Sequence, residues 1–450
     1  MTTSKVKPEG KETNKMQNTP RGMRLHIGIF GKRNAGKSSI LNKLTKQDIS
    51  IVSEIAGTTT DPVEKAMELL PLGPVLFVDT AGIDDEGSLG EMRIQKTKKI
   101  FDRIDVAIIV CDNPNWGSFE QGLYEEFKSK NIPIIAVFNK IDLYDDNAGL
   151  QSRHCERNEA IHQTLTNKWI ASSQAPRNDV QTTLEPVFVS AKENIGIKEL
   201  KEKIINSAPE EFLNAPSIAS DLVPAGELAI LVVPIDLEAP KGRLILPQVQ
   251  TIRDLLDNDS MVMVVKEREL KEAIDRLKKP PALVITDSQA FLKVSADVPK
   301  EIKLTSFSIL FARFKGELNE FVKGTLAIDK LKTGDKVLIC ESCTHHAIGD
   351  DIGRVKIPRW LTQYVGGKLE FKHYAGHDFP ENIKDYKLII HCGACMTNRR
   401  EILSRIMKAN EAGVPITNYG LTIAYSLGIF ERALEPFPMA KLIYEEAKNN

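Results

Sequence analysis

The chain has 450 residues, of which 42% are hydrophobic, and its 60 Lys and Arg residues nearly balance 61 Asp and Glu residues. This length suits about three domains, and the net charge of −1 does not favour a general nucleic-acid or anionic-membrane surface. No apolar run approaches the roughly 18 residues of a membrane-spanning helix. Four of the six cysteines lie in residues 340–395, which favours metal ligation in a reducing cytoplasm over a disulfide framework.

The first 22 residues are polar and rich in lysine, and they contain no apolar segment of the kind found in a secretory signal. This composition predicts a disordered tail. A first domain is expected over residues 23–212, beginning with an apolar strand at 25–30.

A nucleotide-binding loop follows that strand, with the sequence GKRNAGKS at residues 31–38, and a helix continues from it. A strand, a glycine-rich loop and a helix in this order are what a P-loop requires. Its backbone N–H groups and helix dipole bind phosphate, while Lys37 neutralises the β- and γ-phosphate oxygens and Ser38 ligates Mg²⁺. The residues expected to bind phosphate are Gly31, Asn34, Ala35, Gly36, Lys37, Ser38 and Ser39.

Two further segments fit the switch regions of a GTPase. The segment GTTTD at residues 57–61 supplies Thr59, whose hydroxyl is placed to ligate Mg²⁺. An apolar strand at residues 75–78 then leads into DTAG, in which Asp79 is expected to hold the Mg²⁺ shell and Gly82 to bond the γ-phosphate through its N–H. Lys37, Thr59, Asp79 and Gly82 are therefore the predicted catalytic residues.

Two later loops are expected to recognise the base. A strand at residues 134–138 leads into NKID, where the Asp142 carboxylate is able to accept from both N1 and N2 of guanine. A strand at residues 187–189 leads into SAK, the last guanine-contacting loop. Either motif alone would be read as an ordinary turn, but five motifs in order predict a GTPase. The expected base-contacting residues are Asn139, Lys140, Asp142, Ser190, Ala191 and Lys192.

The motifs NAGKS and GTTTD resemble those of the GTPases of tRNA modification and ribosome assembly. This resemblance implies that Asn34 helps to hold a K⁺ ion that acts like an arginine finger, although Arg33 stands where many members have proline. Ile83 and Asp84, rather than a glutamine, follow Gly82, so a Ras-type water-positioning residue is absent there. Slow, K⁺-stimulated hydrolysis is expected.

The segment at about residues 150–182 is polar and aperiodic, and it looks like a translated dispersed repeat element. Such a passenger insertion in a surface loop is tolerated at little cost in free energy. His154, Cys155 and His162 do not favour a metal site here, because the segment has no element that would orient ligands.

A second domain is expected over residues 216–304, where strands and helices alternate as in a small parallel α/β unit. It has no obvious catalytic group. A packing or oligomerisation module is therefore favoured over a second active site.

A third α/β domain is expected over residues 306–450, and it contains two cysteine–histidine clusters. Cys343-Thr344-His345 and His391-Cys392-Gly393-Ala394-Cys395 follow predicted strands, at the strand ends where open α/β sheets place ligands. The helix predicted from residue 398 would favour thiolates through its N-terminus. Three thiolates and two imidazoles predict a metal or iron–sulfur site, with a Cys₃His zinc site as the alternative and Cys340 as a spare thiol.

The chain resembles the maturation GTPase family of [FeFe]-hydrogenase (HydF). The resemblance lies in a C-x-H segment, a 45-residue gap and an H-C-x-x-C segment, which follow the GTPase motifs and the segment at residues 234–245. The resemblance implies a GTPase domain, a dimerisation domain and a [4Fe–4S] domain. It further implies a scaffold that carries a transient di-iron subcluster, made with two radical-SAM maturases, to apo-[FeFe]-hydrogenase. The cluster would be ligated by Cys343, Cys392 and Cys395, with His345 or His391 near a labile fourth position.

Two hypotheses therefore follow from the sequence. The first is a cytoplasmic cluster scaffold and carrier, a homodimer or a higher oligomer, with GTP, Mg²⁺, K⁺ and a [4Fe–4S] cluster as cofactors, without membrane or nucleic-acid partners. The second is a tRNA-modifying GTPase with a structural zinc domain, which the near-neutral charge disfavours.

Overall fold

The computed structural model describes residues 21–46, 53–55, 63–70, 72–80, 100–112, 116–144, 185–213, 216–234, 244–342 and 351–449. The predicted α/β fold is confirmed, because helices and strands build three sheets in chain order. Residues 1–20 of the expected tail, the expected insertion, and Thr59, Gly82, Cys343 and His345 lie outside the described residues. No helix in the described ranges is long and apolar enough to cross a membrane.

The first sheet has seven strands in the order β2-β3-β4-β1-β5-β6-β7. β1 pairs in parallel with both β4 and β5, whereas β2, β3 and β4 are joined in antiparallel pairs. Its strands are β1 (Leu25–Phe30), β2 (Ser53–Ile55), β3 (Val63–Leu69), β4 (Gly73–Asp79), β5 (Val106–Cys111), β6 (Ile134–Phe138) and β7 (Val187–Phe188). Its α-helices are α1 (Lys37–Lys46), α3 (Ser118–Ser129), α5 (Ile197–Asn206) and α6 (Glu210–Leu213).

The second sheet is parallel throughout, with the order β11-β10-β8-β9. Its strands are β8 (Leu228–Val232), β9 (Met261–Val265), β10 (Leu283–Thr286) and β11 (Lys303–Ser306). The helices between and after these strands are α7 (Leu246–Asp257), α8 (Leu270–Asp275), α9 (Phe291–Asp297) and α10 (Phe307–Lys315).

The third sheet is also parallel, with the order β13-β12-β14-β15. Its strands are β12 (Lys336–Glu341), β13 (Glu370–Ala375), β14 (Leu388–His391) and β15 (Ile416–Asn418). The accompanying helices are α11 (Leu318–Thr325), α12 (Ile357–Val365), α13 (Arg399–Ala412), α14 (Tyr419–Ser426), α15 (Phe430–Leu434) and α16 (Pro438–Asn449).

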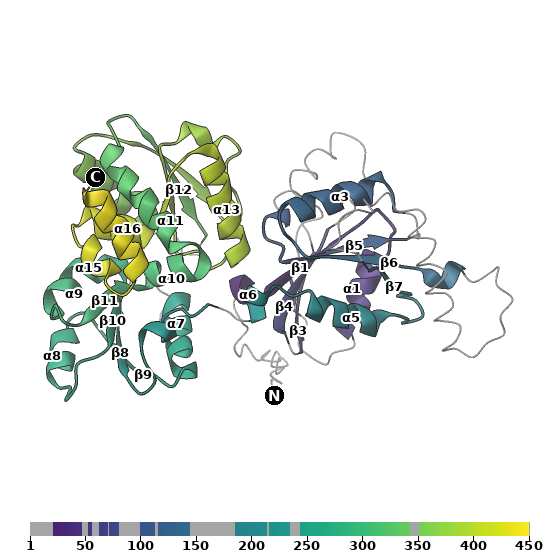
Figure 1. Ribbon diagram of the computed structural model, residues 1–450, viewed down its shortest axis with the longest axis horizontal. Coiled ribbons are helices and arrows are strands. Elements are labelled where there is room, and N and C mark those ends of the chain that lie inside the picture. Colours follow the sequence, from purple (N-terminus) through teal and green to yellow (C-terminus); the bar gives the residue numbers. More distant parts are fainter. Residues whose placement is uncertain are drawn as a thin grey trace, which may run out of the picture.

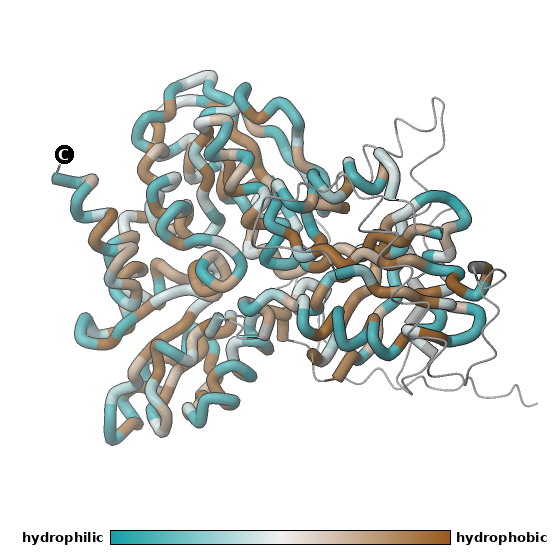
Figure 2. The backbone as a smooth tube through the Cα atoms, turned by 45° about the vertical axis from the view of Figure 1, so that its right-hand side comes forward, coloured by the Kyte–Doolittle hydropathy of each residue, from teal (hydrophilic) through white to brown (hydrophobic). Residues whose placement is uncertain are grey.

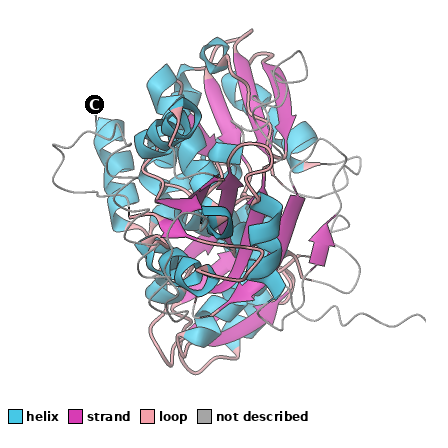
Figure 3. Cartoon of the chain, turned by 90° about the vertical axis from the view of Figure 1, so that its right-hand side faces the viewer, coloured by secondary structure: helices cyan, strands magenta, loops and turns pink. Residues whose placement is uncertain are grey.

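The second and third sheets share a continuous hydrophobic core, whereas the first sheet has separate cores on its two faces. The predicted aromatic helix is α10, and its Phe307, Leu310, Phe311 and Phe314 are buried in the shared core as expected. Ser306 caps this helix by accepting from the Ile309 N–H. Hydrophobic segments accordingly concentrate along the central strands in Figure 2, and Figure 3 shows helices around the sheets.

Two lobes result, with the first sheet in one lobe and the second and third sheets in the other (Figure 1). Helix α13 lies on the side of its lobe that faces the first sheet (Figure 1). Asp102 of the first lobe bonds Ser404 and Lys408 on α13, and Arg400 donates to the Lys130 carbonyl. The helix that follows the cysteine loop therefore also contacts the GTPase-like lobe.

Candidate functional site: a nucleotide-binding loop and a cysteine edge

The P-loop adopts a backbone shape that its glycines make possible. Gly31 and Gly36 have φ angles of +146° and +91°, and a Cβ at these positions would lie 2.2 Å from the Val110 carbonyl oxygen and 2.1 Å from Asn139 Nδ2, respectively. Asn34 is exposed and adopts a left-handed φ of 64°. This backbone shape suits phosphate binding at the start of α1.

The Lys37 side chain is buried and curls back over this loop. Its Nζ donates to the carbonyl oxygens of Gly31 and Lys32 at 2.7 and 2.8 Å. These bonds hold the ammonium group across the loop, beside the backbone that would surround a β- or γ-phosphate.

Ser38 and Asp79 form the part of the Mg²⁺ site that the structure describes. Ser38 Oγ donates to Asp79 Oδ2 at 2.7 Å, which joins the P-loop to the end of β4. Asp79 Oδ1 is buried and has no hydrogen-bond partner within the described residues. A hydroxyl, a carboxylate and a spare buried oxygen suit a hard divalent cation, so these residues fit Mg²⁺.

Asn139 ties the base-recognition loops to the P-loop. Its Nδ2 donates to the Ala35 carbonyl at 2.9 Å, and its Oδ1 accepts from the Ala191 N–H at 3.2 Å. Ser190 Oγ donates to Asp142 Oδ1 at 2.6 Å, which fixes the carboxylate expected to read guanine. Ser39 is exposed on α1, Lys140 has a left-handed φ of 62°, and Lys192 is exposed. The structure therefore brings the predicted phosphate and base loops together.

The cysteine edge forms where β12 and β14 end side by side. Cys340 pairs with His391 in the parallel register, and the Cys392 N–H donates to the Cys340 carbonyl at 2.9 Å. The Met396 N–H donates to the carbonyl of Ser342, the residue before Cys343, at 3.2 Å. Ser342, which directly precedes Cys343, is therefore hydrogen-bonded to the loop that carries Cys392 and Cys395.

The Cys392 sulfur is surrounded by backbone donors. Its Sγ accepts from the Ser342 N–H at 2.9 Å and from the Ala394 N–H at 3.4 Å, and Ala394 has a left-handed φ of 55°. Helix α13 begins after this loop, with Asn398 as its cap. Backbone N–H donors and a helix N-terminus both stabilise a thiolate, the form that ligates metals.

Lys315 adds a buried positive charge near this loop. Its Nζ donates to the Thr397 carbonyl at 3.2 Å and to the carbonyl of Gly22 in the first lobe. Burial lowers the pKa of Lys315 to about 8, although the negative charges of Cys395 and Asp105 oppose that change. By contrast, burial raises the pKa of the spare Cys340 thiol to about 12, which disfavours its thiolate.

His391 is buried, and both of its ring nitrogens are in hydrogen bonds. Arg405 Nη1 lies 2.8 Å from its Nε2, and the Cys392 carbonyl oxygen lies 2.9 Å from its Nδ1. Since a guanidinium group only donates, Nε2 accepts and Nδ1 carries the proton. Burial lowers the pKa of His391 to about 3, and the Arg405 charge acts in the same direction, so the ring is neutral near pH 7.

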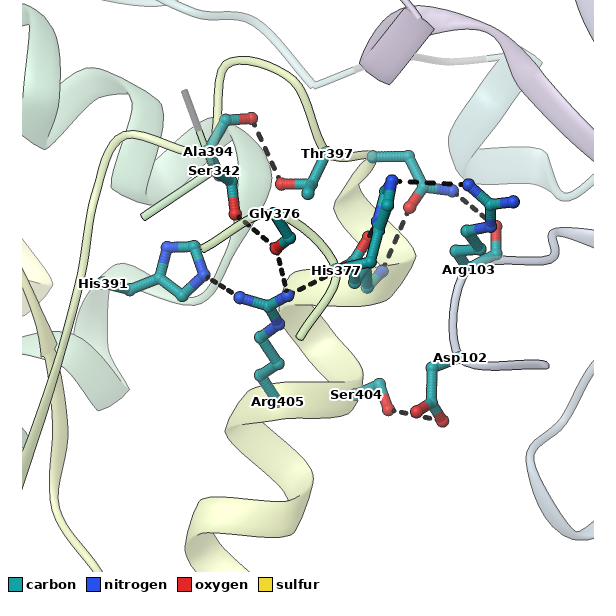
Figure 4. Close-up of polar contacts among 12 residues, drawn as sticks. Asp102, Arg103, Ser342, Gly376, His377, His391, Ala394, Thr397, Ser404 and Arg405 are labelled. Carbon is teal, nitrogen blue, oxygen red and sulfur yellow. Dashed lines mark hydrogen bonds and ion pairs between the residues drawn. The ribbon is translucent and has the colours of Figure 1, made fainter. Parts of the chain in front are cut away.

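Figure 4 shows Arg405 reaching from α13 toward His391 and the Gly376 carbonyl. Arg405 Nη2 also donates to Glu401 Oε1 at 2.6 Å. Sequence reasoning missed Glu401 and Arg405, and their one signal was an acid and a base four residues apart on the helix that follows the cysteine pair. Among the described residues, no group of three His, Cys, Asp or Glu side chains is arranged around one point.

The fold and these loops define the class of protein: a P-loop GTPase domain followed by two α/β domains, the last with a cysteine pair at its sheet edge. Residues 26–140 match the family described as "50S ribosome-binding GTPase". Residues 218–316 match the "Hydrogen maturase F dimerization domain", and residues 319–436 match the "Hydrogen maturase F tetramerization domain". With both of these domains in order behind a GTPase domain, the chain belongs to the hydrogen maturase F family.

Curated relatives match a smaller part of the chain. GTPase Der of Wolinella succinogenes is 33% identical over 207 residues, which cover 44% of this chain and 39% of that protein. The tRNA modification GTPase MnmE of Prochlorococcus marinus is 37% identical over 124 residues, 27% of this chain and 26% of that protein. The chain thus spans well under half the length of these relatives.

The chain is also similar to a solved structure of Aquifex aeolicus Era bound to GDP and AlF₄⁻, with 20% sequence identity and a TM-score of 0.30. The match covers 56% of this chain and 97% of the Era chain. At that score the likeness carries no argument about function.

Proposed function

We propose that this protein is a hydrogenase-maturation GTPase that hydrolyses GTP and holds a [4Fe–4S] cluster at the cysteine edge. In this proposal it serves as scaffold and carrier for the di-iron subcluster of [FeFe]-hydrogenase. The observation that carries the proposal is the order of domains, in which two hydrogen maturase F domains follow a GTPase domain.

The GTPase part rests on residues that already hold one another in place. Lys37 would neutralise the phosphate oxygens, and Ser38 and Asp79 would hold Mg²⁺ with Thr59. Asp142, oriented by Ser190, would accept from guanine. Hydrolysis is expected to be slow, because no glutamine follows Gly82. The resemblance to the GTPases of tRNA modification and ribosome assembly further implies stimulation by K⁺ bound near Asn34.

The cluster part rests on the geometry of the two strand ends. Cys392 and Cys395 would act with Cys343, which follows Ser342 out of β12. A [4Fe–4S] cluster held by three thiolates keeps one iron open to an incoming ligand. The protein residues would supply thiolates stabilised by backbone N–H groups and by the nearby Lys315 charge, and His345 would lie close to the open position.

Several partners follow from the family and remain part of this proposal. They are apo-[FeFe]-hydrogenase, two radical-SAM maturases and further copies of this chain, in the cytoplasm. The dimerization and tetramerization domains support self-assembly. Both C-terminal domains match hydrogen maturase F domains, and these matches give the tRNA-modifying alternative no support.

The test is anaerobic purification of the full chain, followed by analysis of iron, sulfide and zinc and by spin-resonance spectroscopy. Changing Cys343, Cys392 or Cys395 singly to serine should remove most of the iron, since an alkoxide forms far less readily than a thiolate. GTP hydrolysis should continue in these variants. Cys111→Ser is the matched control, because Cys111 is buried in the first lobe and should not affect iron content. Zinc without sulfide in the wild type would contradict the proposal.

A further inference from the structure

A row of hydrogen-bonded side chains links the GTPase domain to the cysteine loop (Figure 4). It begins at Arg103, which precedes β5, and ends at His391, which precedes Cys392. The successive contacts are Arg103 Nη1 to His377 Nε2 at 3.4 Å, His377 Nδ1 to Glu401 Oε2 at 2.9 Å, Glu401 Oε1 to Arg405 Nη2 at 2.6 Å and Arg405 Nη1 to His391 Nε2 at 2.8 Å.

The donors and acceptors along this row are mutually consistent. Arg103 donates to His377 Nε2, which leaves the proton on Nδ1 to be donated to Glu401. Arg405 donates both to Glu401 and to His391, and His391 then donates to the Cys392 carbonyl. Every member thus has one favoured orientation, and a change at either end alters the partners of the next side chain.

The first end of the row is close to the nucleotide site. Arg103 Nη2 forms an ion pair with Glu64 Oε1 at 2.9 Å, and both side chains are largely buried. Glu64 lies on β3, where its register partner on β4 is Val78, and the preceding Val63 is paired with Asp79. A shift of β3 relative to the Mg²⁺-binding aspartate would therefore move the carboxylate that holds Arg103.

The other end of the row contacts the start of the loop that carries Cys392. Arg405 Nη2 donates to the Gly376 carbonyl at 2.9 Å, and Ser342 Oγ donates to the same carbonyl at 3.3 Å. The Ser342 N–H in turn donates to Cys392 Sγ. Arg405 therefore contacts the ends of β13 and β14 at once and fixes how the Cys392 sulfur meets its backbone donors.

Most interactions in this row are strong because the side chains that form them are buried. The side chains of Arg405 and Glu401 are 3% and 6% exposed, and both are charged. Burial alone would raise the pKa of Glu401, but the hydrogen bond from His377 and the charges of Arg405 and Arg103 lower it to about 2. His377 is 47% exposed and is the one half-exposed member of the row. It can therefore be replaced with little risk to folding.

We infer that Arg103, His377, Glu401 and Arg405 are positioning residues that couple the nucleotide state of the GTPase domain to the conformation of the cysteine loop, with His391 as the last member of the row. The inference rests on the proposed function for the identity of the two sites. In this arrangement His391 orients the Cys392 backbone rather than ligating the cluster, because both of its ring nitrogens are in use.

A simpler alternative is that any contact between the two lobes transmits the effect of the nucleotide to the cysteine loop. A variant of Asp102 distinguishes this alternative from coupling through the row. Its Oδ1 accepts from Lys130 at 2.9 Å and from Ser404 at 3.1 Å, and its Oδ2 contacts Lys408. None of these residues belongs to the row, so Asp102→Asn weakens the same interface without touching the row and is the matched control.

The experiment is hydrogen–deuterium exchange of the full-length protein with GDP and with a non-hydrolysable GTP analogue, read at the amides of residues 391–398. In the wild type and in Asp102→Asn, we expect the analogue to change exchange roughly two- to tenfold relative to GDP. In His377→Ala and Arg103→Met this response should vanish, while nucleotide affinity stays within about twofold.

Three results would overturn the inference: no nucleotide response in the wild type, a full response in both row variants, or loss of the response in Asp102→Asn as well. Iron, sulfide and spin-resonance spectra of the same samples separate this outcome from the proposed function. If the wild type holds a [4Fe–4S] cluster but the nucleotide response persists in both His377→Ala and Arg103→Met, the inference fails and the proposed function stands. Cysteine-to-serine variants that keep full iron would remove the proposed function.

Discussion

The nucleotide-binding loop and the cysteine edge occupy equivalent places in their sheets, at the carboxyl ends of parallel strands, but they are held in different ways. In the first, Lys37 bonds the backbone of its own loop and Asn139 bridges two loops of the same domain. In the second, Arg405 and Lys315 come from helices, and Lys315 also bonds Gly22 of the other lobe. The P-loop is thus held by its own motif and domain, whereas the cysteine edge depends on partners distant in sequence.

The largest effect is expected where a single motif residue is removed. Lys37→Ala should lower GTP hydrolysis at least about 100-fold, because the phosphate charge loses its fixed partner. The iron–sulfur spectrum should be retained, since the cysteine edge uses no P-loop residue. Hydrolysis is measured by phosphate release, with Lys43→Ala on the same helix as the control. Loss of both hydrolysis and iron in a folded Lys37→Ala protein would contradict the prediction that cluster binding needs no P-loop residue.

Removing the central residue of the cysteine edge tests the other half of the comparison. Arg405→Met should destabilise the C-terminal domain by about 3 kcal/mol or more, because Glu401 would remain buried without its main positive partner. The measurement is the thermal unfolding transition of the cluster-free protein. Arg359→Met, on an exposed position of α12, should leave the transition unchanged. Equal transitions in the two variants would show that Arg405 contributes no stability.

Asp105 provides a pH-dependent test of the contact between the lobes. It borders a cavity of about 480 Å³ between the lobes and accepts from the His26 N–H at 2.8 Å. Burial raises its pKa from 3.8 to about 6, although hydrogen bonds from His26 and Asn398 and the Arg400 and Lys315 charges oppose this. Between these values the folded state binds more protons than the unfolded state, so stability falls as pH rises from about 4 to 6.

Asp105→Asn should therefore remove this pH dependence. At 1.36 kcal/mol per pKa unit, ionised Asp105 costs at most about 3 kcal/mol above pH 7, and less where the cavity admits water. The variant should gain stability relative to the wild type as pH rises from about 4.5 to 7. Urea unfolding at both pH values measures this gain. A constant difference between the two proteins would show that Asp105 has an ordinary pKa.

The smallest effect is expected from the insertion. Deleting residues 150–182 and closing the gap with a short linker should leave GTP hydrolysis and iron content near wild type, since loop length costs little free energy. The flanking β6 and β7 pair directly with each other, so the sheet does not need the segment. Phosphate release and iron analysis of the deletion protein test this. An inactive or misfolded product would show that the segment has become part of the fold.

Local sequence patterns were sufficient to predict the elements around the P-loop. The strand at 25–30 forms as predicted, and the P-loop, NKID and SAK segments lie together, because each segment fixes its own backbone through glycines, short polar side chains and adjacent strands. The parallel strands that carry the two cysteine loops were also predictable from their apolar runs, and β12 and β14 end side by side as expected.

The sequence by itself therefore determined the fold class, the order of domains, the presence of a GTPase domain and a cysteine pair at a strand end. Only the tertiary structure decided that Arg405 binds His391, that Glu401 is shared with His377, and that Arg103 meets them from another domain. These pairs join residues up to 274 positions apart, and no short spacing encodes them. Motifs are set by backbone geometry within a few residues, whereas buried charge pairs are set by which surfaces fold against each other.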